Sequence, residues 1–200
     1  MERLYSPKRI KEIMDAAGIN FNKNLGQNFL IDGNIVRRIV KAADVTKNDV
    51  VLEIGPGIGT LTEELLMNAK KVISVEIDNR LIPILEENFK DHDNFVLIHG
   101  DAMKVDFSEI ISEHSQNSDI KVIANLPYYI TTPIMERLLT EGLPIKSCTF
   151  MVQKEVAERI TAKPSSKEYG SLTLFISCFA DAEIVIKAPK EVFMPQPKVD

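Results

Sequence analysis

Three closely spaced glycines follow a short apolar run in the segment Glu53-Ile54-Gly55-Pro56-Gly57-Ile58-Gly59-Thr60. Glycines at such a position permit a tight turn and let a ligand come close to the backbone. The spacing is G-x-G-x-G, whereas dinucleotide sites use G-x-G-x-x-G and P-loops continue into Gly-Lys-Ser/Thr. The turn therefore favours a nucleoside-type ligand without a pyrophosphate, and a purely structural strand–helix turn is the alternative.

Acidic residues end two of the apolar runs that follow. Glu76 comes 21 residues after Gly55, where a carboxylate can accept hydrogen bonds from both hydroxyls of a ribose. Asp101 follows the next run and could accept a hydrogen bond from the exocyclic amine of an adenine. A solvated strand end is the alternative for Glu76, and a helix cap or loop position is the alternative for Asp101.

The most specific segment is Asn125-Leu126-Pro127-Tyr128, which follows another apolar run. The exocyclic amine of a base is a poor nucleophile, because its lone pair is delocalised into the ring. Two acceptors on its N–H groups, the Asn125 side-chain oxygen and the Leu126 carbonyl, would localise that pair. Pro127 would hold the turn rigid, and Tyr128 offers a face on which a base can stack. A proline-kinked loop with a buried tyrosine is the structural alternative.

Short apolar runs alternate with helical patterns along most of the chain. The runs predict strands at 50–54, 72–75, 95–98, 120–124, 149–152 and 183–186. Helices are expected at 7–17, 32–43, 60–68, after Asp78, and at 132–139, 154–160 and 170–179, whereas 19–31 has the composition of a loop. This order predicts a doubly wound α/β fold, a mostly parallel sheet with helices on both faces, whose ligands bind at the carboxyl ends of the strands.

Composition narrows the class of protein. The 200 residues are 44% hydrophobic and 26% charged, which suits a folded domain, and no apolar run approaches the ~18 residues of a membrane span. We expect a basic N-terminal arm with an access loop at 1–45 and a catalytic domain at 46–200, because residues 1–50 carry net charge +3 and residues 51–150 carry −8. The two cysteines, Cys148 and Cys178, predict reduced core thiols in a cytoplasmic protein and no metal site.

The chain resembles the ribosomal RNA adenine N6-dimethyltransferases, which use S-adenosylmethionine, from about Asn24 to Asp200. The segments that carry the resemblance are Asn24–Leu30, Glu53–Thr62, Glu76–Asp78, Gly100–Ala102, Asn125–Tyr128, Met151–Ala157 and Phe193–Asp200. The resemblance implies the Rossmann-like fold of class I S-adenosylmethionine-dependent methyltransferases. It also implies that S-adenosylmethionine is the cofactor and S-adenosylhomocysteine its product.

Roles for individual residues follow from the same resemblance. The implied cofactor-binding residues are Asn28, Leu30, Gly55, Gly57, Glu76, Asp101 and Asn125. The implied catalytic residues are Asn125, Leu126, Pro127, Tyr128 and Phe193, with Phe193 stacking on the target adenine opposite Tyr128. Residue types and spacing alone do not predict roles for Asn28, Leu30 and Phe193.

Leu25-Gly26, Pro56, Leu126 and Gln153–Val156 make the chain similar to the bacterial small-subunit enzymes. Such enzymes dimethylate the N6 amines of two adjacent adenines near the 3′ end of 16S ribosomal RNA in an immature small subunit, and a monomer is expected. Alternatives are a large-subunit (23S) dimethyltransferase of the macrolide-resistance type and a mainly RNA-binding ribosome assembly factor. The glycine spacing disfavours a third alternative, a nicotinamide oxidoreductase.

The family continues beyond Val199-Asp200 with a last sheet strand and a small helical domain. The resemblance therefore leads us to expect a truncated catalytic domain with an exposed sheet edge. Cofactor binding should survive that loss better than methylation of the natural substrate.

Overall fold

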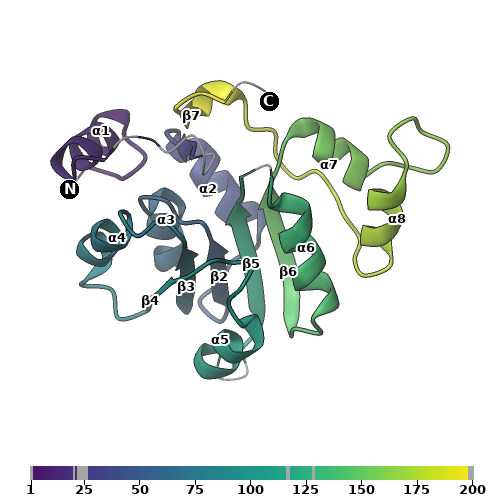
Figure 1. Cartoon of the computed structure of the whole chain (residues 1–200), viewed down its shortest axis with the longest axis horizontal. Helices are drawn as coiled ribbons and strands as arrows, with labels where there is room; N and C mark the ends of the chain where they lie inside the picture. The colour runs from purple at the N-terminus through teal and green to yellow at the C-terminus, as the bar shows by residue number, and fades with distance from the viewer. Residues whose placement is uncertain (1, 20, 22–26, 116–117, 128, 198–200) are drawn as a thin grey trace.

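Five parallel strands form the centre of the computed structural model, which describes residues 2–19, 21, 27–115, 118–127 and 129–197. The strands are β2 (Val50–Ile54), β3 (Lys71–Glu76), β4 (Phe95–His99), β5 (Ile120–Asn125) and β6 (Ile145–Met151), in the order β4-β3-β2-β5-β6 (Figure 1). The chain winds outward from β2 in one direction and from β5 in the other. The switch point between these two strands is where a ligand crevice is expected in such a sheet.

Helices cover both faces of this sheet. On one face, α2 (Gly33–Ala42), α3 (Thr60–Asn68) and α4 (Ile82–Phe89) pack against strand residues such as Val51, Val72 and Ile123. On the other face, α5 (Phe107–His114) and α6 (Thr131–Thr140) pack against Leu52 and its neighbours. Successive strand residues therefore enter opposite cores, as buried parallel strands require. The predicted doubly wound α/β fold is confirmed.

A second, two-stranded sheet joins segments from opposite ends of the sequence. Strand β1 (Phe29–Leu30) pairs antiparallel with β7 (Phe193–Met194), and the Ile31 N–H donates to the Val192 carbonyl over 2.8 Å. The prediction of a loop over 19–31 is therefore wrong at residues 29–30. A two-residue strand has too little periodicity to be recognised from sequence.

The N-terminal segment shares its packing with the sheet. Helix α1 (Pro7–Ala16) buries Ile10, Ile13 and Met14, and Asp32 caps α2 by accepting from the N–H groups of Asn34 and Ile35 at 2.7 and 3.2 Å. Residues of α2 and α3 lie in one hydrophobic cluster. The division of the chain at residue 45 stays a prediction.

Beyond β6 the chain forms α7 (Lys154–Ile160), α8 (Ser171–Ser177) and a short 3-10 helix η2 (Lys190–Val192) (Figure 1). The predicted strand at 183–186 is wrong, since this segment has no strand pairing and Ile184 and Val185 are 43% and 49% exposed. An apolar pattern favours a strand only where a neighbouring strand offers hydrogen bonds. Residues 179–191 and β6 instead line a groove of about 1370 Å³, the β6 groove.

Other differences from prediction are local. Strand β6 begins at Ile145 rather than residue 149, and α5, capped by Asp106 through the Glu109 N–H, was not predicted. Cys178 is exposed, so the prediction of two core thiols is wrong for that residue, while burial raises the pKa of the Cys148 thiol to about 12. No helix among the described residues is both long and apolar enough to cross a membrane.

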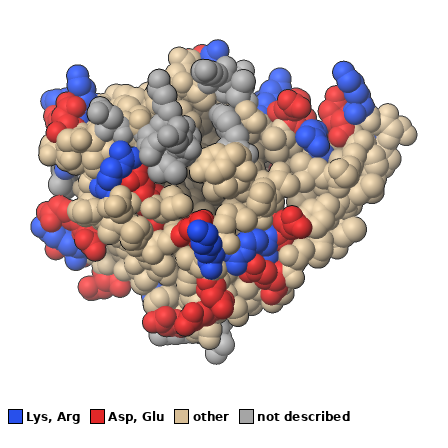
Figure 2. All heavy atoms as spheres, in the orientation of Figure 1, with Lys and Arg blue, Asp and Glu red and all other residues tan. Residues whose placement is uncertain are grey.

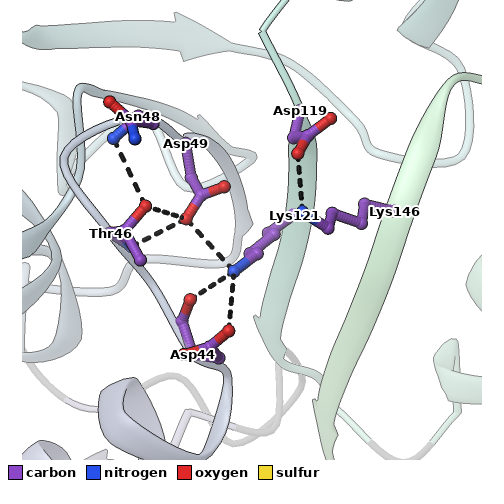
Figure 3. Close-up of polar contacts among 7 residues, drawn as sticks. All are labelled: Asp44, Thr46, Asn48, Asp49, Asp119, Lys121 and Lys146. Atoms are coloured by element: carbon purple, nitrogen blue, oxygen red, sulfur yellow. Dashed lines mark hydrogen bonds and ion pairs between the residues drawn. The ribbon is translucent and has the colours of Figure 1, made fainter.

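A buried ion pair lies near the amino ends of the central strands (Figure 3). Lys121 Nζ is 3.1 Å from Asp49 Oδ2, both side chains are about 5% exposed or less, and the amine also donates to the Asp44 carbonyl. Asp49 accepts from the N–H and hydroxyl of Thr46 at 2.7 and 2.8 Å. Burial alone would raise the pKa of Asp49, but these bonds and Lys121 outweigh it and lower that pKa. The pair fixes the turn before β2 against β5.

Candidate functional site

A small pocket of about 90 Å³ lies at the carboxyl ends of β2, β3 and β5. Six residues of the predicted cofactor set line it: Asn28, Leu30, Gly55, Gly57, Glu76 and Asn125. They come from four separate parts of the chain, and the sheet's switch point brings them together. The same pocket is lined by Gln27, Glu53, Thr60 and Tyr129, for which the sequence predicted no role.

Gly57 and Gly59 in the turn after β2 have backbone angles that favour glycine, and side chains pack too closely against them to leave room for a Cβ atom. Gly57 has φ +64°, and a Cβ there would lie 2.7 Å from the Phe29 ring. Gly59 has φ +92°, and its Cβ would lie 2.4 Å from Phe89. Residues that carry a Cβ atom rarely adopt these φ values. A Cβ at Gly57 or Gly59 would also displace an aromatic ring. The turn can therefore hold Phe29 of β1 directly against its backbone.

Glu76 is held in place by backbone hydrogen bonds to both of its oxygens. Oε2 accepts from the Gly57 N–H at 3.1 Å, and Oε1 accepts from the Asp78 N–H at 2.8 Å. Burial raises the pKa of Glu76, and these hydrogen bonds oppose the rise. Each oxygen keeps a second lone pair, so the carboxylate can still accept from two ligand hydroxyls.

Glu53 is a second buried acid beside the pocket, and it is 2% exposed. Its Oε2 accepts from the hydroxyls of Thr62 and Ser74, each at 2.7 Å. Burial raises the pKa of Glu53 to about 7, the two hydroxyls oppose the rise, and the charge of Glu76 adds to it. The sequence signal for this residue was an acid inside an otherwise apolar strand.

This acid predicts a pH-dependent stability. Because Glu53 titrates near 7 in the folded protein and near 4.5 unfolded, the folded state holds one more proton between these values, and stability falls as pH rises through them. Glu53→Gln removes that dependence and can still accept from both hydroxyls. The free energy of unfolding of the variant minus that of the parent should rise by about 3 kcal/mol from pH 4.5 to 7.

Urea unfolding of both proteins at pH steps from about 4.5 to 8, which span the two pKa values, checks this result. Glu76 titrates in both proteins, so its contribution cancels in the difference except for the part that comes from its coupling to the charge of Glu53. Unfolding free energies that run parallel across the whole range would show that Glu53 does not carry the shift.

Asn125 stands where the small pocket meets the β6 groove. Asn28, Leu61 and Asn125 line both, and Leu126 and Phe193 line the groove only. The Asn125 side-chain amide donates to the Asn28 carbonyl at 3.2 Å, so residues 27–30, the described part of the predicted cofactor-binding loop (called the cofactor loop below), are bonded to the turn after β5. A group in the pocket and a group in the groove would therefore meet at Asn125.

The size of the small pocket has a consequence for the cofactor loop. Sites for small organic ligands usually enclose about 300–1000 Å³, several times the volume found here. Gln27 Nε2 donates to Asp78 at 2.8 Å, and Phe29 packs on the glycine turn, so the loop narrows the pocket. We expect residues 27–30 to move outward when a ligand as large as a nucleoside enters. The sequence prediction for residues 24–26 falls outside the described residues.

The other residues for which the sequence predicted a role are Asp101, Pro127 and Tyr128. Asp101 does not line the small pocket; its Oδ1 accepts from the Met103 N–H at 2.9 Å within the turn that follows β4. The Pro127 carbonyl accepts from the Thr131 hydroxyl at 3.1 Å and ties the turn to α6. Tyr128 lies outside the described residues. The adjacent Tyr129 is 61% exposed and lines the small pocket.

Acidic and basic side chains alternate on the surface around the site. Along the upper rim of Figure 2, over α1 and α7, basic side chains stand beside acidic ones. Lys8 and Arg9 lie 3.9 and 3.8 Å from Glu12, and Lys154 lies 3.8 Å from Glu158. Lys8 and Lys154 are 76% and 62% exposed, and ion pairs of such exposed lysines contribute little to stability.

Comparison with known proteins gives one consistent result. Residues 18–200 match the family model described as ribosomal RNA adenine dimethylase. A Clostridium botulinum protein named ribosomal RNA small subunit methyltransferase A is 54% identical over 191 residues, which cover 95% of this chain and 68% of the relative. The Geobacillus kaustophilus protein of that name is 52% identical over 196 residues, covering 98% of this chain and 67% of the relative.

Solved structures agree. A dimethyladenosine transferase from Plasmodium falciparum superposes with a TM-score of 0.76 and 34% identity, over 86% of this chain and 60% of that chain. The 23S rRNA methyltransferase ErmE gives 0.75 and 31%, over 86% of this chain and 66% of that chain. The fold is that of the class I S-adenosylmethionine-dependent methyltransferases, and the chain belongs to the ribosomal RNA adenine dimethylase family.

Proposed function

We propose that this protein transfers methyl groups from S-adenosylmethionine to the N6 amine of adenine in small-subunit (16S) ribosomal RNA. The observation that carries the proposal is the place of Asn125, at the end of β5, where the small pocket and the β6 groove meet. A methyl donor and an acceptor base held in the two spaces would face each other across this residue. Family membership supplies the reaction class.

The small pocket fits the donor in its chemistry. Glu76 offers carboxylate oxygens to ribose hydroxyls, and the turn at Gly55 and Gly57 allows close approach of the amino-acid part. When bound, S-adenosylmethionine supplies an electrophilic methyl group on a sulfonium. Asp101, in the turn after β4, keeps acceptor sites beyond its contact with the Met103 N–H, so its carboxylate can still accept from the adenine amine of the cofactor.

The chain's own residues prepare the acceptor amine. The Asn125 amide oxygen and the Leu126 carbonyl accept from its two N–H groups, which draws the lone pair out of the ring and onto nitrogen. Phe193, on the groove side, and Tyr128 would stack on the base after it leaves its helix. Holding the amine and the methyl carbon ~3–3.5 Å apart is the main catalytic contribution. The amine loses its proton to water after transfer.

The similarity to small-subunit enzymes supports the choice of substrate. Relatives with that name are 52–54% identical to this chain, whereas the 23S rRNA methyltransferase ErmE is 31% identical. We propose two adjacent adenines near the 3′ end of the RNA as targets, in an immature small subunit. The protein would act there as a monomer in the cytoplasm.

Transfer of labelled methyl groups from S-adenosylmethionine tests the proposal. Immature small ribosomal subunits that lack the modification serve as substrate, with large subunits as the parallel sample. Label is expected as N6,N6-dimethyladenine in small subunits only. Label in large-subunit RNA would instead identify an enzyme of the resistance type.

A binding measurement separates the remaining outcomes. Cofactor binding without any transfer would show that the described residues form a cofactor site but do not suffice for the ribosomal substrate. Neither binding nor transfer would contradict the proposal as a whole.

A further inference from the structure

Arg137, near the end of α6, bonds through all three nitrogens of its guanidinium group. Nη1 donates to the Ala102 carbonyl at 2.7 Å, and Nη2 donates to the Val105 carbonyl at 3.0 Å. Nε donates to Glu141 at 2.6 Å, and the guanidinium carbon lies 4.8 Å from the centre of the Phe107 ring. The rigid planar fork of an arginine fixes the groups that it binds. Arg137 therefore holds the turn that contains the two carbonyls against α6.

This turn begins at Asp101 and closes on that residue. The N–H groups of Lys104 and Val105 donate to the Asp101 carbonyl at 2.7 and 3.0 Å, and the Met103 N–H donates to its carboxylate at 2.9 Å. The amine of Lys104 also lies 3.5 Å from the carboxylate, but that side chain is 82% exposed, so the ion pair contributes little. Because these backbone bonds join Asp101 to the rest of the turn, its carboxylate moves with the turn as one unit.

The turn is attached to other elements at both of its ends. Before it, the Gly100 N–H donates to the Glu76 carbonyl at 2.9 Å, which joins the turn to the end of β3. At its other end, Arg137 joins it to α6. Helix α6 is itself bonded to the turn after β5 through the Thr131 hydroxyl. The place of Asp101 relative to the rest of the site therefore depends on the contacts that Arg137 makes.

We infer that Arg137 is a positioning residue, which places the Asp101 carboxylate and so sets the preference of the site for the 6-amino group of the cofactor's adenine. The inference rests on the proposed function, in which Asp101 accepts from that amine. A hydrogen bond from an amine to a carboxylate depends on distance and angle, so a shift of the turn loses it although Asp101 is unchanged. Contacts to the ribose and the amino-acid part come from other elements and stay.

Calorimetric titration of two ligands into the whole chain tests the inference. The ligands are S-adenosylhomocysteine and its analogue with hydrogen in place of the 6-amino group. The parent should bind S-adenosylhomocysteine at least about tenfold tighter, because only this ligand can donate to Asp101. Arg137→Met, which has no donor, should weaken S-adenosylhomocysteine binding about tenfold and binding of the analogue by less than about threefold. Equal effects on the two ligands would overturn the inference.

A double-mutant cycle shows whether Arg137 acts through Asp101. Asp101→Ala removes the acceptor, so the two ligands should then bind about equally. Adding Arg137→Met to this variant should change the affinity for S-adenosylhomocysteine by less than about threefold. A further tenfold loss would show that Arg137 affects binding by another route, as a merely structural residue does, and would overturn the inference.

Two other variants separate the carbonyl contacts from the rest of the arginine's environment. Glu141→Gln removes the charge of the ion-pair partner but leaves both carbonyl bonds, so it should keep the affinity ratio of the two ligands within about threefold of the parent. A ratio as low as that of Arg137→Met would count against the inference. Arg137→Lys keeps a charged donor without the fixed fork and should give an intermediate ratio.

Thermal unfolding is recorded for every variant. If Arg137→Met does not unfold cooperatively, Arg137→Lys replaces it in the comparison, with an expected loss of about threefold in the ratio, and an unchanged ratio overturns the inference. If the parent binds neither ligand, the proposed function itself fails. If the parent binds both equally, the role of Asp101 and this inference fail together, while cofactor binding stands.

Discussion

Replacement of Asn125 by alanine is expected to slow methyl transfer by about 100- to 1000-fold, the usual effect of losing one preorganised polar contact to the reacting group. Under the proposed function, this substitution removes an acceptor for the target amine, so the lone pair of the amine stays delocalised in the ring. Affinity for S-adenosylhomocysteine should fall by less than about tenfold, since Glu76 and the glycine turn are unchanged. Single-turnover rates and calorimetry measure the two effects separately.

Two companion variants define what is lost. Asn125→Asp keeps an acceptor oxygen but cannot donate to the Asn28 carbonyl, so it should retain more activity than alanine while loosening the cofactor loop. Asn48→Ala, in an exposed turn before β2, should behave as the parent. An aspartate variant as slow as alanine would mean that the contact to Asn28, rather than the acceptor, carries the effect.

Replacement of Lys121 by methionine is expected to lower the free energy of unfolding by about 3–5 kcal/mol. The substitution keeps most of the chain length but leaves Asp49 buried at 3% exposure with Thr46 as its remaining described partner. An uncompensated buried carboxylate is costly because the surrounding low-dielectric interior cannot solvate it. Urea unfolding at pH 7 measures the loss.

The neighbouring ion pair supplies a matched control (Figure 3). Lys146 lies 2.6 Å from Asp119, but both side chains are more than half exposed, so Lys146→Met should leave the unfolding midpoint close to that of the parent. Adding Asp49→Asn to Lys121→Met removes the stranded charge and should recover part of the loss. Equal effects of the two lysine substitutions would show that burial does not decide the strength of the pair.

The sheet could be predicted because its strands are apolar on both faces. Runs such as 50–54 and 120–124 are apolar apart from Glu53 and Lys121, and helical spacing separates them, so the parallel order follows from general rules. Residues 183–186 form a similar short apolar run, but they do not form a strand. Whether such a run becomes a strand depends on a partner elsewhere in the chain, and no local pattern contains that information.

The candidate site, like the sheet, could be predicted from the sequence only in part. Glu76 and Asn125 stand at strand ends, where the fold class alone places ligands, and the structure brings them to one pocket. Asn28 and Phe193 needed the family resemblance, because the β1–β7 pairing that positions them spans most of the sequence.

The β1–β7 pairing also has a consequence for how the protein opens. Phe29 and Met194 are about 165 residues apart, so forming their two-residue ladder closes a very long loop for few hydrogen bonds. Elements of this kind are among the least stable parts of a fold and open locally while the core stays intact. We expect Leu30 and Phe193 to exchange their amide protons together and faster than β2 and β5. One partial unfolding event would then release residues 27–30 and Phe193 together, so a cofactor product and a methylated base that are held as proposed would leave through the same opening.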